Sequence, residues 1–266
     1  MIKFFRHIRQ RLIRENRFSK PASPARPTDS SGRAGRYLLY AVGEIVLVVI
    51  GILIALQINT WNEERKTNAN LSKALKALKT DLAQDSLLIA AYLPEVTQQY
   101  QFNESLRERM ARPKATVDTL LKITRNEFNP NWNNPIFYNT NAYKSLNDTG
   151  LIDVMNDSLK THIKDYYNGK FYREGMVESI TKDYREKLAQ YVNTYTFGST
   201  DLHDQGRLID SLVWDNVDLS HLAASFQGIS NFKRILFRLT RDEMEYSLHN
   251  SKGLIQHIDQ NLDSDD

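Results

Sequence analysis

The stretch YLLYAVGEIVLVVIGILIALQINTWNEERK, residues 37–66, decides how the rest of the chain is organised. Its apolar run, residues 38–56, contains a single charged residue, Glu44. As a helix rising 1.5 Å per residue, this run spans about 29 Å, close to the ~30 Å hydrocarbon core of a bilayer. Tyrosines stand at one end and a tryptophan at the other, where aromatic rings favour the membrane interface. The stretch therefore predicts a transmembrane helix at residues 37–61.

A cleaved signal peptide is the competing interpretation of this stretch. A signal peptide has an apolar core of about 7–15 residues behind a short basic region. Here the apolar run is longer, 36 residues precede it, and no small-residue cleavage site follows it. We therefore expect an uncleaved anchor.

Positive charge is concentrated before this anchor. Residues 1–36 carry a net charge of +8, and the remainder of the chain carries −5. The positive-inside rule then predicts a cytoplasmic N-terminus and an exported domain. Topology and anionic lipids explain this basic segment, so the pI near 8.9 does not indicate a nucleic-acid partner.

Two features inside the anchor are candidates for contacts with another span. Glu44 is either a functional carboxylate within the membrane or a side chain that reaches the interface near Arg36. Gly43, Gly51 and Ala55 lie on roughly one side of the helix, and such small residues let two helices approach closely. These residues, together with the helix predicted at 68–92, indicate a homo-oligomer or a protein partner.

Two segments precede the anchor. Residues 1–18 have apolar positions at helical spacing and predict a basic amphipathic helix on the membrane surface, with a disordered basic tail as the alternative. The basic residues expected to contact membrane lipids are Lys3, Arg6, Arg9 and Arg14. Residues 19–36 are rich in Pro, Ser and Arg and predict a disordered linker.

The sequence GEIVLVVIGILIALQINTWNEERK, which begins at Gly43, and the opening MIKFFRHIRQRL resemble the signature of a family of uncharacterised single-pass membrane proteins of Gram-negative bacteria. A weaker similarity runs from Asn139 to Gly150. The Pro/Ser/Ala/Arg segment at 21–36 departs from the family pattern. The resemblance implies an inner-membrane protein with a helical domain in the periplasm, and it implies no particular activity.

Residues 62–266 predict an all-helical domain, because apolar residues recur at helical spacing and no strand-like alternation persists. In residues 68–92, leucines follow an alternating 4/3 pattern that Asp85 interrupts. This pattern fits either a dimerising coiled coil or a helix that packs on its own domain. Pro94 is expected to break or kink the helix, so that a second helix at 95–110 returns toward the membrane.

Further helices are expected along the remaining chain. A short helix is predicted near 117–125, and a long helix at 159–195 follows a cap at Asn156 or Asp157. Separate helices at 218–226 and 230–262 complete the domain. The simplest arrangement is a bundle of long antiparallel helices.

The segment FNPNWNNPIFY, residues 128–138, interrupts these helices. Two prolines and four asparagines exclude regular structure, yet four residues are aromatic. Aromatic rings in an irregular loop form either a surface that binds sugars or peptides or a plug on the helical core. The candidate binding residues are Phe128, Trp132, Phe137 and Tyr138.

The sequence contains no recognisable catalytic or metal-binding motif. It has no cysteine, which excludes disulfides, thiol nucleophiles and cysteine zinc sites. His249 and His257 are separated by about 12 Å along one helix, too far to share a metal. We therefore expect neither an enzyme nor a cofactor. The expected function is that of a membrane-anchored scaffold or sensor acting by protein–protein binding, with a small-ligand or cell-envelope glycan site at 128–138 as the alternative.

Overall fold

The computed structural model describes residues 31–132, 136–195 and 206–264. These residues form helices joined by turns and irregular segments, and no strand occurs among them. The all-α class is therefore confirmed. By its internal contacts the chain divides into two units, Met1–Glu63 and Glu64–Asp266.

The first unit contains the N-terminal part of α2 (Ser31–Ala111). Within the described residues, α2 is the one helix long and apolar enough to cross a membrane, with a mean hydropathy of 2.6 over 18 residues. Residues 41–60 are all exposed, and a Cβ at Gly43 or Gly51 would meet no atom within 4 Å. No other described residue covers this apolar surface.

The start of α2 differs from the predicted linker at 19–36. Within the described residues α2 extends from Ser31, so residues 31–36 are helical. The last proline of the linker is Pro27, and no later residue in the linker blocks a helix. The predicted surface helix at 1–18, with Lys3, Arg6, Arg9 and Arg14, lies outside the described residues.

Of the two outcomes expected at Pro94, a break followed by a separate returning helix at 95–110 is wrong. The helix continues through Pro94 to Ala111. Pro94 has no N–H to offer the carbonyl of Ala90, and both residues are exposed. Water can therefore hydrate this carbonyl, which reduces the cost of a proline inside a helix.

The second unit contains the other elements, in the order α3 (Val117–Lys122), η1 (Ile123–Glu127), α4 (Asn141–Asp148), η2 (Leu151–Asp153), α5 (Asp157–Thr194), α6 (Arg207–Ile209), η3 (Asp210–Trp214) and α7 (Leu219–Ser264). Asn156 caps α5, as expected, by accepting a 2.8 Å hydrogen bond from the backbone N–H of Leu159. Gly150 has φ 70°, a left-handed conformation that suits the turn after α4.

The two final helices predicted at 218–226 and 230–262 are one helix, α7. Ile229 and Ser230 are buried, so packing holds the intervening turn in the helical conformation. In α5, Gly169 has a packing role, since a Cβ there would lie 2.0 Å from the hydroxyl oxygen of Tyr246 on α7.

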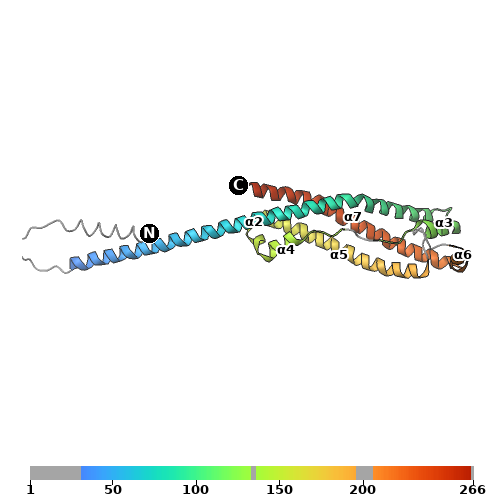
Figure 1. The fold of residues 1–266 in the computed structure, drawn as a ribbon, viewed down its shortest axis with the longest axis horizontal. Helices are drawn as coiled ribbons and strands as arrows, with labels where there is room; N and C mark the ends of the chain where they lie inside the picture. Colours follow the sequence, from blue (N-terminus) through green and yellow to red (C-terminus); the bar gives the residue numbers. More distant parts are fainter. Residues whose placement is uncertain (1–30, 133–135, 196–205, 265–266) are drawn as a thin grey trace, which may run out of the picture. The chain divides into compact units, whose positions relative to one another are not determined.

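The C-terminal part of α2 lies beside α7 and runs in the opposite direction (Figure 1). Lys79 near the start of this part pairs with Asp259 at 2.6 Å. Asn103, farther along α2, donates a 3.1 Å hydrogen bond to the carbonyl of Ser230. Residue numbers therefore rise along α2 as they fall along α7.

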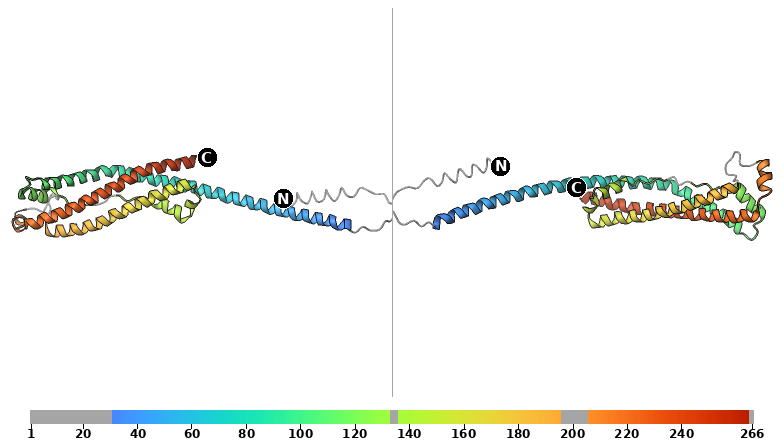
Figure 2. Two further views of the ribbon diagram at one scale, coloured as in Figure 1. Left: turned by 180° about the vertical axis from the view of Figure 1, so that it is seen from behind. Right: turned by 90° about the horizontal axis from the view of Figure 1, so that it is seen from below.

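α5 also runs antiparallel to α7, as both views in Figure 2 show. His162 near the start of α5 meets His257, and Tyr195 at its end hydrogen-bonds His221. Since α2 and α5 both oppose α7, they are parallel to each other. The expectation that all the long helices are antiparallel is therefore wrong for the pair α2 and α5.

The regularly spaced leucines of α2 pack inside the helical domain. Leu75, Leu78, Leu82 and Ile89 are all buried. The first three belong to an apolar cluster with residues of α4, α5 and α7, and Ile89 belongs to a second cluster with residues of α7. Of the two interpretations of residues 68–92, the structure shows the helix that packs on its own domain.

Because α2 and α5 are parallel, the chain between them must return along the bundle. We refer to residues 128–140 as the crossing segment, and its described parts, residues 128–132 and 136–140, lie beside α7. Phe128 packs edge-to-face on Phe226 with ring centroids 5.2 Å apart. Tyr138 donates a 2.6 Å hydrogen bond to Glu243. The segment therefore runs in the same direction as α7.

The described residues of the crossing segment lie outside the helices, so their buried backbone polar groups need side-chain partners. Lys233, which is 4% exposed, donates hydrogen bonds to the carbonyls of Asn129 and Asn131. The hydroxyl of Tyr184 donates a hydrogen bond to the carbonyl of Pro130. Buried side chains of α5 and α7 thus hold the segment in place.

Replacing Tyr184 with Phe should lower the free energy of unfolding by about 1–3 kcal/mol, because the buried carbonyl of Pro130 loses its donor. Tyr191→Phe is the matched control. Tyr191 is equally buried on the same helix, and its hydroxyl has no hydrogen-bond partner among the described residues. Denaturant unfolding of the full-length chain in detergent measures both changes. An equal loss in the two variants would contradict the role given to the Tyr184 hydroxyl.

Candidate functional site

Asp85 interrupts the apolar pattern of α2 because it holds the end of the crossing segment. Its Oδ1 accepts hydrogen bonds from the backbone and side-chain N–H groups of Asn139, at 2.9 and 2.8 Å. Its Oδ2 lies 3.1 Å from Nζ of Lys170 on α5. The side chains of Asp85 and Lys170 are 2% and 0% exposed, and such a pair is stable only when its remaining polar atoms are satisfied.

Lys170 connects this pair to further polar groups. Its Nζ lies 3.9 Å from the ring centroid of Tyr138 and 3.9 Å from Oε1 of Glu174. Tyr138 donates to one carboxylate oxygen of Glu243, and Ser247 donates to the other at 2.8 Å. We refer to Asp85, Tyr138, Lys170, Glu174 and Glu243 as the buried charge cluster.

The buried charge cluster holds three carboxyl groups and one ammonium group. Burial raises the pKa of Glu243, although the hydrogen bonds from Tyr138 and Ser247 oppose this effect. Burial also raises the pKa of Glu174, with Lys170 opposing it. The pKa of Tyr138 is raised well above its ordinary value, first by burial and then by Glu243, so Tyr138 remains a hydrogen-bond donor.

A groove with a volume of about 720 Å³ opens beside the buried charge cluster. We name it the Phe137 groove, and it is lined by the end of the crossing segment, by one face of α5 and by Glu243 of α7. Phe137 lines it and is 86% exposed. Sites for small ligands have volumes of about 300–1,000 Å³ and combine apolar surface with a few charged groups.

The charges on the α5 wall of this groove are separated by sign. Glu174 and Glu178 lie at one end, and Lys182 and Arg185 lie at the other. At 1.5 Å per residue, Glu174 and Arg185 are about 16 Å apart along the helix. The Phe137 groove therefore has an acidic half and a basic half.

The four predicted aromatic residues of the segment have different positions. Phe128 is 2% exposed and belongs to the core. Trp132 is half-buried and packs edge-to-face on Phe237 with ring centroids 4.8 Å apart. Tyr138 is bound to Glu243, and Phe137 alone of the four is largely exposed. Three of these residues thus attach the segment to the core, and one is free to contact a ligand.

The sequence analysis missed the buried charge cluster. Its members come from α2, the crossing segment, α5 and α7, and they are far apart in the sequence. Asp85, as a carboxylate in an apolar helical pattern, was the one signal that pointed to it. The predicted membrane residues Gly43, Glu44, Gly51 and Ala55 are exposed on α2 and belong to a different unit from this site.

A pair of histidines also joins α5 to α7. Nδ1 of His162 lies 3.0 Å from Nδ1 of His257. Burial lowers the pKa of His162, and His257 lowers it further. Spacing along a single helix could not show this pairing. Among the described residues, no group of three or more His, Cys, Asp or Glu side chains could hold a metal ion.

In the part of the chain that the structure describes, the fold and the site define an all-helical protein with one membrane-length apolar helix and a charged groove in its helical domain. Residues 44–202 match DUF6090, a family of unknown function, and this match covers more than half of the chain. The chain belongs to this family. No curated protein matches the chain. No solved structure matches it.

Glu243→Gln should raise the thermal midpoint of the full-length chain at pH 7.5 and leave it unchanged near pH 4. Because the pKa of Glu243 is raised in the folded state, folding favours the neutral carboxyl group, and stability falls as pH rises above the unfolded pKa. Glutamine is neutral at every pH and retains an acceptor. The exposed Glu186→Gln is the control, and a pH-independent difference for Glu243→Gln would contradict the assignment.

Proposed function

We propose that this protein is a membrane-anchored scaffold or sensor that acts by binding a partner protein, and that the Phe137 groove receives an extended segment of that partner. The observation that carries the proposal is an 86% exposed phenylalanine beside a groove of about 720 Å³ with charges of both signs. An aromatic side chain next to a concave surface is a typical anchor of a binding interface.

The charges of the groove define the partner segment. Glu174 and Glu178 favour a lysine or arginine side chain, and Lys182 and Arg185 favour a carboxylate about 16 Å away. An apolar side chain between these charges would pack on Phe137. We propose binding rather than catalysis, because Tyr138 and Glu243 are tied to each other by a hydrogen bond.

We further propose that the protein spans the bacterial inner membrane once, with its N-terminus in the cytoplasm and its helical domain in the periplasm. Three observations support this topology. The apolar part of α2 is exposed on every side, residues 1–36 carry a net charge of +8, and the sequence resembles single-pass proteins of Gram-negative bacteria. Membrane lipids would then surround residues 38–56.

Binding of a small ligand or a cell-envelope glycan in the same groove is the second candidate function. The volume of the groove suits a small molecule. Phe137 could stack on a sugar ring, and Glu174 and Glu178 could accept hydrogen bonds from its hydroxyl groups.

A photoactivatable amino acid at Lys182 should crosslink the full-length protein to a partner in living cells, and the same amino acid at Tyr172 should not. Both residues are exposed on α5, but only Lys182 lines the Phe137 groove. Adding Phe137→Ala should reduce the adduct at least about tenfold, as expected from the loss of one interface anchor. Quantitative mass spectrometry of the adduct measures this change.

Equal adducts from positions 182 and 172, or an adduct that Phe137→Ala leaves unchanged, would contradict the proposal. A thermal shift with muropeptides or other envelope glycans that Phe137→Ala abolishes, without any protein adduct, would support the second candidate. Trp132→Ala is unsuitable for either test, since Trp132 packs on Phe237 in the core.

A further inference from the structure

We propose that Glu174 determines which partner segment the Phe137 groove accepts: it selects an ammonium or guanidinium group and takes up this cation in exchange for a proton. The inference rests on the function proposed above and adds a charge requirement and a pH dependence to it. It is drawn from the position of Glu174, which belongs both to the buried charge cluster and to the lining of the groove.

Glu174 is the carboxyl group of the buried charge cluster that a ligand can reach. Its side chain is 30% exposed, whereas Asp85 and Glu243 are 2% and 3% exposed. Glu243 also accepts hydrogen bonds at both of its carboxylate oxygens. Within the described residues no hydrogen bond reaches the carboxylate of Glu174, and its one ion pair there, with Lys170, is 3.9 Å long. Glu174 is therefore able to bind a ligand group, and the two buried carboxyl groups are not.

Negative charge is in excess around Glu174. When all groups are ionised, the three carboxylates and one ammonium group of the buried charge cluster leave two negative charges unbalanced. Burial raises the pKa of Glu174, Lys170 opposes this effect, and Glu243 and Asp85 add to it. The titratable groups that face Glu174 are Lys170 and Glu178 on α5, Asp85 on α2, Glu243 on α7 and Tyr138 on the crossing segment. A cation would relieve this excess charge, as a proton does.

Lys170 shows how this part of the domain holds an ammonium group. Its Nζ lies 3.1 Å from Oδ2 of Asp85 and 3.9 Å from the ring centroid of Tyr138, so a carboxylate and an aromatic face share the charge. The lining of the Phe137 groove offers a ligand the same two kinds of group, the carboxylate of Glu174 and the exposed ring of Phe137. A bound cation would stabilise the carboxylate of Glu174, and the proton of its carboxyl group would pass to water.

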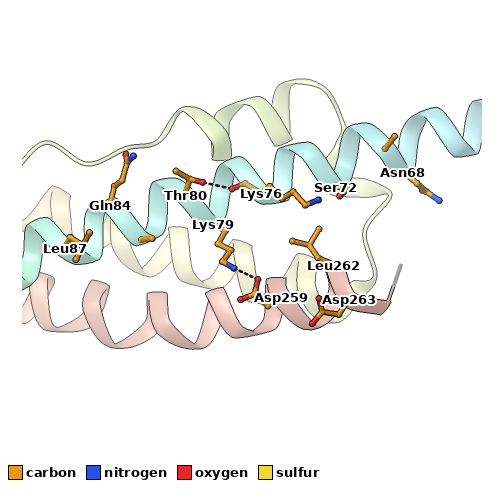
Figure 3. Close-up of a pocket in the computed structure, with 12 residues that line it drawn as sticks. Asn68, Ser72, Lys76, Lys79, Thr80, Gln84, Leu87, Asp259, Leu262 and Asp263 are labelled. Carbon is orange, nitrogen blue, oxygen red and sulfur yellow. Dashed lines mark hydrogen bonds and ion pairs between the residues drawn. The ribbon is translucent and has the colours of Figure 1, made fainter. Parts of the chain in front are cut away.

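The larger groove of the domain, with a volume of about 800 Å³, lies between α2 and the end of α7. Figure 3 shows Lys79 of α2 reaching toward Asp259 of α7, with 2.6 Å between Nζ and Oδ1. These two charges already balance each other. In the Phe137 groove, by contrast, Glu178, Lys182 and Arg185 form no ion pair within the described part of the chain. Of the two grooves, the Phe137 groove is therefore the better site for a charged ligand.

The exchange of a proton for a cation makes binding depend on pH. A ligand that stabilises the ionised form of a carboxyl group binds more tightly as pH rises through the pKa of that group in the free protein. Because burial has raised this pKa for Glu174, affinity should still increase above about pH 4, where ordinary carboxyl groups titrate. A partner segment with a neutral side chain at the same place should bind weakly at every pH.

A synthetic hexapeptide with blocked ends tests this exchange. It carries lysine at its first position, leucine at its third and aspartate at its sixth, so in an extended conformation its charges are about 16 Å apart. Fluorescence anisotropy measures its affinity for the full-length chain in detergent from pH 5 to pH 7.5. The affinity should rise at least about threefold over this range. Acetylation of the peptide's lysine, which removes its charge, should weaken binding at least about tenfold and abolish the rise.

Glu174→Gln and Glu178→Gln are matched variants, since each removes one negative charge from the same wall of the groove. Only Glu174→Gln should abolish the rise in affinity with pH, because Glu178 is exposed. A constant wild-type affinity, a rise that Glu174→Gln retains, or equal binding of the acetylated peptide would each overturn the inference and leave the partner site standing. Failure of both peptides to bind at any pH would contradict the partner site itself, and this inference with it.

Discussion

The helical domain depends on one constraint: a non-helical backbone segment has to cross back along the bundle in contact with its core. The carbonyl groups and N–H groups of such a segment lose water and must find other partners. Lys233, Tyr184 and Asp85 supply these partners from three different helices. Burial lowers the pKa of Lys233 to about 8, because the side chain that holds the segment is desolvated inside the domain.

The candidate site follows from this constraint, because each of its buried polar groups needs the next one as a partner. Asp85 binds the end of the segment and therefore needs a cation, which Lys170 supplies. Lys170 in turn lies against Tyr138, and Tyr138 binds Glu243. The acidic half of the Phe137 groove is thus the exposed edge of a cluster that also stabilises the fold. Substitutions within the cluster would therefore change stability and binding together, whereas Phe137 contributes to the groove without contributing to the core.

Local sequence patterns were sufficient to predict those parts of the fold that depend on residues close together in the sequence. The apolar run, the cap at Asn156 and the irregular character of the described parts of residues 128–138 were all predicted from composition and spacing. Pro94 could not be interpreted correctly, because its effect depends on whether Ala90 is exposed, which is a tertiary property. The parallel arrangement of α2 and α5, and with it the meeting of Asp85 and Lys170, depends on long-range packing that no single segment encodes.

The crossing segment also fixes which of its side chains a ligand can reach. At its described end Ile136 is buried, Phe137 is exposed and Tyr138 is bound inward, the alternation of an extended chain. The order of these three residues therefore fixes which side chain the groove presents: exchanging Phe137 with Ile136 would turn a different side chain outward without changing the composition of the segment.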